Sequence, residues 1–216
     1  MVVPESEEQR RKRLHQRELF DGVAELYDAS RRGYPEEVID FLVTTAVLQP
    51  GSAVLEVGCG TGQLTEQLAS CSLGLTAIDI GASMVAVAKR RVERSAVSFH
   101  VVSFEAFEAA EASLDLIVSA TAWQWIDPDV RFDKAARLLR PGGWLALLSM
   151  GEKYDDPFGM NLLDMWVERA TDGGAWVKQR KLSDTEIVAG TGLFDVSVQK
   201  AHSESAVLRA PFARRC

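Results

Sequence analysis

The chain has 216 residues, of which 47% are hydrophobic, and this is enough to build the core of one α/β domain with a modest addition. Its 31 acidic residues outnumber its 24 basic residues. The resulting net charge of -7 argues against a general role in binding nucleic acid, because that affinity comes largely from Lys and Arg. The basic run from Arg10 to Arg17 is the local exception, and we interpret it as a solvated helix face.

The cysteines and the first residues indicate the compartment. Cys59, Cys71 and Cys216 form no CxxC pair and no cluster with the spacing of a zinc site, so we expect a reducing environment and no metal. Residues 1–13 lack the apolar stretch of a secretory signal, and no stretch is apolar over a bilayer-spanning length. The sequence therefore predicts a cytoplasmic protein with no membrane partner.

Two helices are predicted before the first strand. Apolar residues follow a helical spacing over residues 19–27, and the Gly- and Pro-containing segment 30–35 interrupts that pattern. The helical spacing returns over residues 38–47 and ends at a Pro-Gly turn. We expect residues 1–35 to form a helical lid segment and residues 36–216 to form the main domain.

Strands and helices then alternate along the chain. Short apolar runs predict strands at residues 53–57, 75–79, 97–102, 114–120 and 144–150. Helical patterns lie between them, at residues 62–69, 83–92 and 130–139. The last helix is expected to end at a Pro-Gly-Gly turn. This alternation implies right-handed crossovers onto one parallel sheet with helices on both faces.

The pattern changes after residue 150. Residues 159–170 and 183–190 have helical spacing, and we expect an insertion at about 151–182. Residues 194–198 and 205–208 are predicted strands, and their short connection requires antiparallel pairing. The predicted fold class is therefore α/β, with a Rossmann-like, doubly wound, mainly parallel seven-stranded sheet that has a C-terminal antiparallel hairpin.

The most specific motif lies where the first predicted strand ends. Residues 54–62 read VLEVGCGTG, so a buried strand ends in three glycines at alternate positions and opens into a helix. Glycines permit a tight turn and a close approach of the backbone to a ligand, and the helix N-terminus offers free N–H groups and partial positive charge. A dinucleotide-binding loop has the pattern GxGxxG. That pattern fails here because its third glycine is replaced by Gln63.

Asp79 ends the second predicted strand. A carboxylate at this position can accept hydrogen bonds from both hydroxyls of a ribose. A strand-end Asp can equally cap the helix that follows, and the position alone does not separate the two roles. The glycine loop one strand earlier favours the ribose role for Asp79.

Further motifs lie along the chain from Phe20 to about Leu208. They are FDGVAELY at 20–27, RRGYP at 31–35, SFE at 103–105, SATAWQW at 119–125 and LRPGG at 139–143. Together with the glycine loop and Asp79, they resemble the class I S-adenosylmethionine-dependent methyltransferases. More narrowly, they resemble the type 11 or type 12 branch of bacterial enzymes that act on small molecules.

The resemblance implies that S-adenosylmethionine is the cofactor and that the glycine loop holds its methionine and ribose parts. The residues implied for this contact are Glu56, Gly58, Gly60 and Gly62. The resemblance also implies that Asp79 holds the ribose hydroxyls. This placement agrees with the general rule that ligands of open α/β sheets bind at the carboxyl ends of the strands.

The same resemblance implies contacts for the rest of the cofactor. Ile80 and Met84 would lie against the adenine face, and Phe104 and Glu105 would meet its edge, with Glu105 accepting from the amino group. Ala120 would lie under the sulfonium, at the end of the fourth strand. These roles rest on the resemblance alone.

The remaining implied residues cover the site or face the acceptor. Arg31 would pair with the cofactor carboxylate, and Tyr27 and Tyr34 would help to close the site. Tyr34, Trp123 and Gln124 are candidates for contact with the acceptor. For Trp123 the alternative is a place in the core, because aromatic side chains dominate burial.

Methyl transfer from a sulfonium mainly requires alignment of donor and acceptor, and it needs a base only when the acceptor atom must lose a proton. Many relatives carry a His between the two tryptophans, whereas this chain has Gln124, which cannot accept a proton at neutral pH. Nothing in the sequence selects His15, His100 or His202 as a base. The catalytic residues are therefore left unassigned.

The sequence predicts a methyltransferase that acts on a small molecule, through an O, N or C acceptor atom that the sequence does not distinguish, and that is a monomer or homodimer. One alternative is an NAD(P)-dependent oxidoreductase of Rossmann type, against which Gln63 and the terminal hairpin count. The other is a catalytically silent methyltransferase-fold binding protein, for which Gln124 leaves room.

Overall fold

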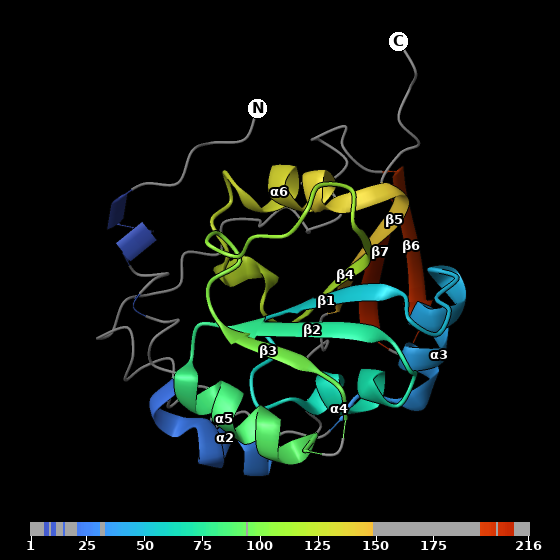
Figure 1. The fold of residues 1–216 in the computed structure, drawn as a ribbon. Coiled ribbons are helices and arrows are strands. Elements are labelled where there is room, and N and C mark those ends of the chain that lie inside the picture. The colour runs from blue at the N-terminus through green and yellow to red at the C-terminus, as the bar shows by residue number, and fades with distance from the viewer. Residues whose placement is uncertain are drawn as a thin grey trace.

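The structure is a computed structural model of the chain (Figure 1). It describes residues 7–8, 10–11, 15, 21–30, 33–93, 95–148, 195–201 and 203–209. The predicted helices at 159–170 and 183–190, the expected insertion at about 151–182, and Arg31 lie outside the described residues.

The alternation of strands and helices is observed in the order predicted. The parallel strands are β1 (Ala53–Val57), β2 (Gly74–Asp79), β3 (Ser98–Val101), β4 (Leu114–Ala120) and β5 (Leu139–Leu148). The helices are the 3-10 helix η1 (Asp21–Val23), α2 (Ala24–Ser30), α3 (Glu36–Thr45), α4 (Gln63–Ala69), α5 (Ala82–Arg91), the 3-10 helix η2 (Trp123–Trp125) and α6 (Arg131–Leu138). The N-terminal segment therefore includes a helix over part of the range predicted for it.

The five parallel strands are arranged in the order β3-β2-β1-β4-β5. β1 pairs with β2 on one side and with β4 on the other. Successive strands are therefore added on one side of β1 up to β3 and on the other side from β4 onwards. This order confirms the Rossmann-like, doubly wound part of the prediction. It also places the ends of β1, β2 and β4 at the point where ligands of open α/β sheets bind.

Two further strands follow β5 in the sheet. β7 (Ser203–Arg209) pairs with β5, and β6 (Asp195–Ala201) pairs with β7, and both pairings are antiparallel. Figure 1 shows them at the edge beyond β5. Their bounds are longer than those predicted for the two strands of the hairpin.

β5 differs from the prediction at its start. We expected a Pro-Gly-Gly turn at residues 141–143 and a strand that begins only after it, whereas β5 begins at Leu139. Leu114 of β4 pairs with Leu139, and Leu116 pairs with Trp144, so the three residues form part of an irregularity inside the β4–β5 ladder. Gly142 has a φ of 79°, which is the backbone conformation that glycine adopts at little cost.

Two hydrophobic layers cover the sheet, and side chains alternate between them along each strand. In β5, Leu145 and Leu147 belong to the layer under α6, whereas Ala146 and Leu148 belong to the layer under α3 and α4. Figure 1 shows α6 on one side of the sheet and α2, α4 and α5 on the other. Burial on both faces explains why the strands read as nearly continuous apolar runs.

Among the residues that the structure describes, no helix combines the length and the apolar content needed to cross a bilayer.

Candidate functional site

The loop between β1 and α4, residues 58–62, has the conformation that its three glycines permit. The φ angles of Gly58, Gly60 and Gly62 are 74°, 54° and 88°, all in the left-handed region that L side chains rarely adopt. The strand-end amides of Gly58 and Cys59 both donate to the carbonyl of Ile78 in β2, at 2.9 and 3.1 Å. The loop is therefore held against the end of β2.

Two of these glycines are also required by close packing. A Cβ on Gly58 would lie 2.3 Å from the Cβ of Ala122, and a Cβ on Gly62 would lie 2.9 Å from the Cβ of Ala88 in α5. Gly60 differs, because no atom of the described residues lies within 4 Å of the position its Cβ would take. No described residue therefore packs against the middle of the loop, while its ends pack tightly.

Asp79 holds the loop from the end of β2. Its Oδ2 accepts a hydrogen bond from the amide of Gly60 at 2.9 Å, and its Oδ1 accepts one from the amide of Gly81 at 2.9 Å. The side chain thus caps the turn before α5, which is one of the two roles left open by the sequence, and it also fixes the loop. Asp79 itself is half-buried.

Glu56 is buried beneath the loop. Only 2% of the residue is exposed, and its Oε2 accepts a hydrogen bond from the Thr65 hydroxyl of α4 at 2.7 Å. Burial raises the pKa of Glu56 to about 8; the hydrogen bond from Thr65 opposes this rise and the charge of Asp79 adds to it. Glu56 is therefore largely protonated at neutral pH.

The predicted adenine-side residues lie after β2 and β3. Met84 is buried against Ala24 of α2, and Ile80 is half-buried. Phe104 is 2% exposed, so its side chain belongs to the core. Glu105 is half-buried, and its Oε1 accepts from the amide of Asp127 at 3.0 Å. The structure brings Glu105 to a position where it also orders the segment before α6.

The chain after β4 carries backbone strain at the predicted sulfonium position. Ala120 ends β4 and is half-buried, and the next residue, Thr121, has a φ of 54°. A left-handed backbone at a β-branched residue costs on the order of 1–3 kcal/mol and is typical of functional sites. Two hydrogen bonds hold it: the Thr121 amide donates to Leu148 at 2.8 Å, and the Gln124 side chain donates to the Thr121 carbonyl at 2.8 Å.

Trp123 and Gln124, the two candidates for acceptor contact in η2, have opposite environments. Trp123 is 2% exposed, and its ring centroid lies 5.6 Å from that of Phe104 and 5.7 Å from that of Phe132. Its indole therefore lies in the core, which was the alternative stated for it. Gln124 is exposed. Of the two, Gln124 is the residue whose side chain reaches the surface.

The N-terminal helices are attached to the loop side of the sheet. Asp21 of η1 accepts hydrogen bonds from the amides of Ser83 and Met84 at 2.7 and 3.3 Å, so it caps the N-terminus of α5 from outside that helix. Tyr27 is half-buried beside the Met84 cluster. Tyr34 is held by its backbone, which exchanges hydrogen bonds with the Gln67 side chain at 2.9 and 2.6 Å. Both tyrosines flank the loop region.

Sequence reasoning missed several polar residues that shape this site. They include Asp21, Asp28, Thr65, Arg91 and Thr121. Asp21 belongs to a residue type that caps helices, which is a usable signal, but its target lies 62 positions away. No local sequence pattern predicts that the other four residues contribute to the site.

The residues present fit an adenosyl cofactor. The open position at Gly60 admits a ligand close to the backbone, the half-buried Asp79 can accept from two hydroxyls, and the buried Glu56 lies below. The arrangement lies at the carboxyl ends of β1, β2 and β4, where the order of strands reverses.

Comparison with known proteins agrees with this geometry. Residues 54–143 match a methyltransferase domain family. A curated relative, malonyl-[acyl-carrier protein] O-methyltransferase of Hahella chejuensis, is 36% identical over 131 residues, which cover 59% of this chain and 47% of that protein. The chain spans about half the length of the curated relatives it matches.

Two solved structures have a similar fold. Haemonchus contortus phosphoethanolamine N-methyltransferase 2, in complex with phosphomonomethylethanolamine and S-adenosylhomocysteine, is 26% identical with a TM-score of 0.57, over 76% of this chain and 38% of that one. A putative S-adenosylmethionine-dependent methyltransferase from Methanococcus maripaludis is 13% identical with a TM-score of 0.65, over 100% of this chain and 99% of that one.

The reversed strand order, the glycine loop and Asp79 together form one end of an α/β domain. Residues 54–143 thus resemble a methyltransferase domain, and the fold is similar to that of solved S-adenosylmethionine-dependent methyltransferases.

Proposed function

We propose that this chain binds S-adenosylmethionine at the carboxyl ends of β1, β2 and β4 and transfers its methyl group to a small molecule. The observation that carries the proposal is the junction of Gly60 and Asp79. There a glycine with open space beside it donates to a half-buried carboxylate 19 residues further along the chain. The match of residues 54–143 to a methyltransferase domain and the complex of a similar protein with S-adenosylhomocysteine support the choice of cofactor.

In this proposal the loop of Gly58, Gly60 and Gly62 receives the methionine and ribose parts of the cofactor. Asp79 accepts from the ribose hydroxyls while it keeps its hydrogen bonds to the loop. Glu56 lies beneath the loop and supplies a carboxyl group that ionises when a positively charged group approaches.

In this proposal the flanking residues surround the rest of the cofactor. Ile80, Met84 and Glu105 border the adenine, and Phe104 supports that border from the core. Ala120 lies under the sulfonium at the end of β4. Tyr27, Tyr34 and Arg31 close the site from the N-terminal side, with residues 1–35 as a lid segment on the main domain of residues 36–216.

When bound, the cofactor supplies an activated methyl group, so the protein mainly has to align donor and acceptor. The strained backbone at Thr121 fixes the wall beside the predicted sulfonium position, and Gln124 holds that strain through its hydrogen bond to the Thr121 carbonyl. Gln124 is a positioning residue here, because an amide does not accept a proton at neutral pH. Acceptors that need no strong base therefore suit this site best.

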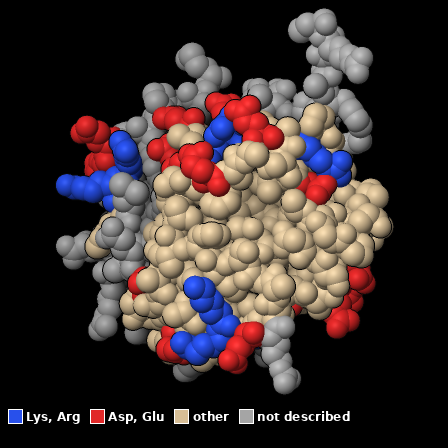
Figure 2. Space-filling view, viewed as in Figure 1, with Lys and Arg blue, Asp and Glu red and all other residues tan. Residues whose placement is uncertain are grey.

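The acceptor atom differs among similar proteins. The Hahella chejuensis relative is an O-methyltransferase of malonyl-[acyl-carrier protein], and the Haemonchus contortus protein is an N-methyltransferase of phosphoethanolamine. We expect residues 151–182, which lie outside the described part of the chain, to select the acceptor. On the face in Figure 2, Lys and Arg side chains lie beside Asp and Glu, which supports an acceptor other than nucleic acid. The cytoplasmic location and the monomeric or dimeric state remain predictions.

Titration calorimetry with S-adenosylmethionine and with NAD tests the proposed cofactor. We expect binding of the first and no binding of the second. Tight NAD binding without S-adenosylmethionine binding would overturn the proposal. Incubation with a panel of amines, carboxylates and phenols then tests turnover, with S-adenosylhomocysteine as the product measured. If the wild-type protein forms no more of this product than Asp79→Ala does, the chain is a silent binding protein.

A further inference from the structure

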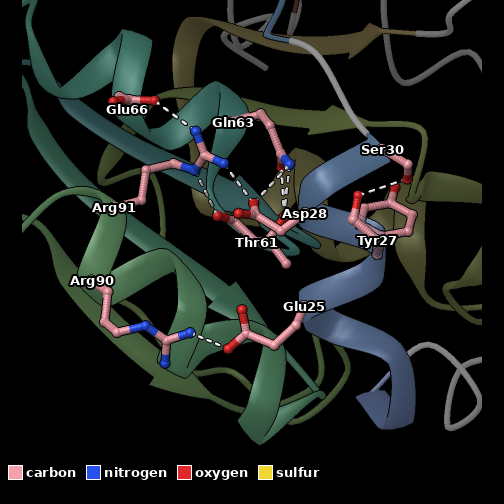
Figure 3. Close-up of polar contacts among 9 residues, drawn as sticks. All are labelled: Glu25, Tyr27, Asp28, Ser30, Thr61, Gln63, Glu66, Arg90 and Arg91. Carbon is pink, nitrogen blue, oxygen red and sulfur yellow. Dashed lines mark hydrogen bonds and ion pairs between the residues drawn. The ribbon is translucent and has the colours of Figure 1, made fainter.

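A polar cluster joins the N-terminal helix α2 to the glycine loop, and the function proposed above does not use it. We name it the Asp28 cluster, and Figure 3 shows its members. They are Asp28 of α2, Thr61 of the loop, Gln63 and Glu66 of α4, and Arg91 of α5. Elements that lie far apart in the sequence therefore meet at one point beside the loop.

Arg91 is the centre of the cluster. Its Nε donates to the carbonyl of Thr61 at 3.1 Å, its Nη1 to Glu66 at 3.0 Å, and its Nη2 to Oδ1 of Asp28 at 2.5 Å. A guanidinium presents these donors in a rigid plane, so the three acceptors are fixed relative to one another. One side chain thus sets the distance between α2, α4 and the loop.

Gln63, the residue that breaks the dinucleotide pattern, completes the cluster. It is 8% exposed, and its Nε2 donates to the hydroxyl of Thr61 at 2.7 Å and to Oδ1 of Asp28 at 3.2 Å. Asp28 therefore receives donors from both Gln63 and Arg91. Burial alone would raise the pKa of Asp28, but the hydrogen bonds and charge of Arg91 lower it, so the carboxylate is ionised at neutral pH.

The position of Thr61 explains how the Asp28 cluster can affect the glycine loop. Thr61 lies between Gly60, whose amide donates to Asp79, and Gly62, which packs on α5. It is fully buried, and both its hydroxyl and its carbonyl are used by the cluster. A shift in the position of α2 would therefore also move the backbone on either side of Thr61, including Gly60.

A second ion pair between the same helices provides the natural comparison. Arg90 of α5 pairs with Glu25 of α2, and their side chains are 60% and 78% exposed. The corresponding values for Arg91 and Asp28 are 25% and 26%. Figure 3 shows the Arg90 pair beside α2 and away from Thr61. Exposed pairs of this kind contribute little to stability.

We infer that Asp28, Gln63 and Arg91 are positioning residues. Through them, the position of α2 on the domain determines whether the glycine loop has its cofactor-binding conformation. The inference rests on the proposed function, because it assigns α2 a part in holding S-adenosylmethionine. On this inference, α2 affects cofactor binding through the loop, and Asp28 itself does not contact the cofactor.

The test compares Asp28→Asn with Glu25→Gln, which removes one acidic charge from the same helix and breaks the exposed pair. Hydrogen exchange of the loop amides, measured without cofactor, is the first readout. We expect faster exchange over residues 58–62 in Asp28→Asn and no change in Glu25→Gln. A purely structural role would instead lower the melting temperature without a local increase in loop exchange under conditions where the variant is fully folded.

The second readout is the dissociation constant for S-adenosylmethionine at about 50 and about 500 mM salt. We expect Asp28→Asn to weaken binding about tenfold, which is about 1.4 kcal/mol, and Glu25→Gln to stay within about twofold. Arg91→Lys keeps the charge but loses the planar fork, and we expect a similar loss. It also serves as the second variant if Asp28→Asn does not fold.

The outcomes separate the two proposals. If wild-type protein binds S-adenosylmethionine and Asp28→Asn and Arg91→Lys leave both affinity and loop exchange unchanged, the coupling is wrong and the proposed function stands. If wild-type protein does not bind S-adenosylmethionine but the variants loosen the loop, the proposed function fails while the mechanical coupling between α2 and the loop is supported.

Discussion

The two sides of the candidate site are built from different kinds of contact. On the side of β1 and β2, the loop is held by directional polar contacts, such as those of Asp79 with Gly60 and of Arg91 with Thr61. On the side of β4, the chain is supported by aromatic packing of Trp123 between Phe104 and Phe132. The first side is held by hydrogen bonds to backbone groups of the loop, and the second by packed aromatic rings.

This difference predicts different tolerance to change. A polar contact fails when one partner is removed, because the other is left without a hydrogen bond. Aromatic packing accepts substitutions that nearly conserve volume. The two sides meet where Gly58 of the loop touches Ala122 after β4.

Gly58→Ala should have the largest effect, because it breaks the contact between the two sides. The new Cβ would lie 2.3 Å from the Cβ of Ala122, at a residue whose φ is 74°. Backbone strain and overpacking together should lower the free energy of unfolding by roughly 3–5 kcal/mol, measured by denaturant titration. Ala122→Gly in the same chain should restore part of that loss. No recovery in the double variant would mean that the clash is not the cause.

Glu56→Gln should change how stability depends on pH. The pKa of Glu56 is about 8 in the folded chain and near 4.5 when unfolded, so the folded state retains a proton that the unfolded state releases between these values. The contribution of Glu56 to the free energy of unfolding of the wild type is therefore largest below about pH 4.5. It falls as the pH rises to about 8, by at most about 1.4 kcal/mol per pH unit. Glu56→Gln removes this component.

Denaturant titrations of both proteins from about pH 5 to about pH 9 test that prediction. The difference in unfolding free energy between Glu56→Gln and wild type should grow in favour of the variant up to about pH 8 and then level off. A constant difference across the range would show that Glu56 has an ordinary pKa in the folded protein.

Asp79→Ala should weaken S-adenosylmethionine binding by roughly 100-fold, because it removes a charged acceptor for two hydroxyls at about 1.5 kcal/mol each. It also leaves the amides of Gly60 and Gly81 without their present acceptor. Calorimetric titration measures the loss, and Asp133→Ala, at an exposed acid of α6, is the control. Equal affinity in Asp79→Ala and wild type would contradict the proposed ribose contact.

Trp123→Phe should have the smallest effect and so mark the tolerant side. The Nε1 atom of Trp123 has no hydrogen-bond partner among the described residues, so the variant loses no hydrogen bond that they supply. The smaller phenyl ring leaves a cavity in the core, so we expect a loss of roughly 1–2 kcal/mol in unfolding free energy and unchanged cofactor affinity. A drop in affinity beyond the drop in stability would mean that the indole contacts the ligand after all.

Much of the fold could be predicted from the sequence. The bounds predicted for β1 and β4 agree with the structure, and β2 and the helices differ by one or a few residues at their ends. Apolar runs and glycine patterns are local signals, so they identify the loop and the order of strands. The start of β5 was wrong because a Pro-Gly-Gly sequence favours a turn, whereas pairing of Leu139 with Leu114 keeps it within the ladder.

The candidate site was predictable only in part. Glu56, the three loop glycines and Asp79 lie together because strand ends in a parallel sheet meet at one edge. The burial of Trp123 could be stated only as one of two options, because a sequence of alternating aromatic residues does not say which ring faces the core. Its neighbours Phe104 and Phe132 decide this through packing.

The sequence by itself determined the glycine loop, the acid at the end of β2 and the alternation that brings them together, since each depends on backbone conformations and burial periods that short segments encode. Only the tertiary structure decided that Asp28 meets Arg91 across 63 positions, and that Ala122 covers Gly58. Such contacts depend on how whole elements pack, because charge and size allow many partners until packing selects one.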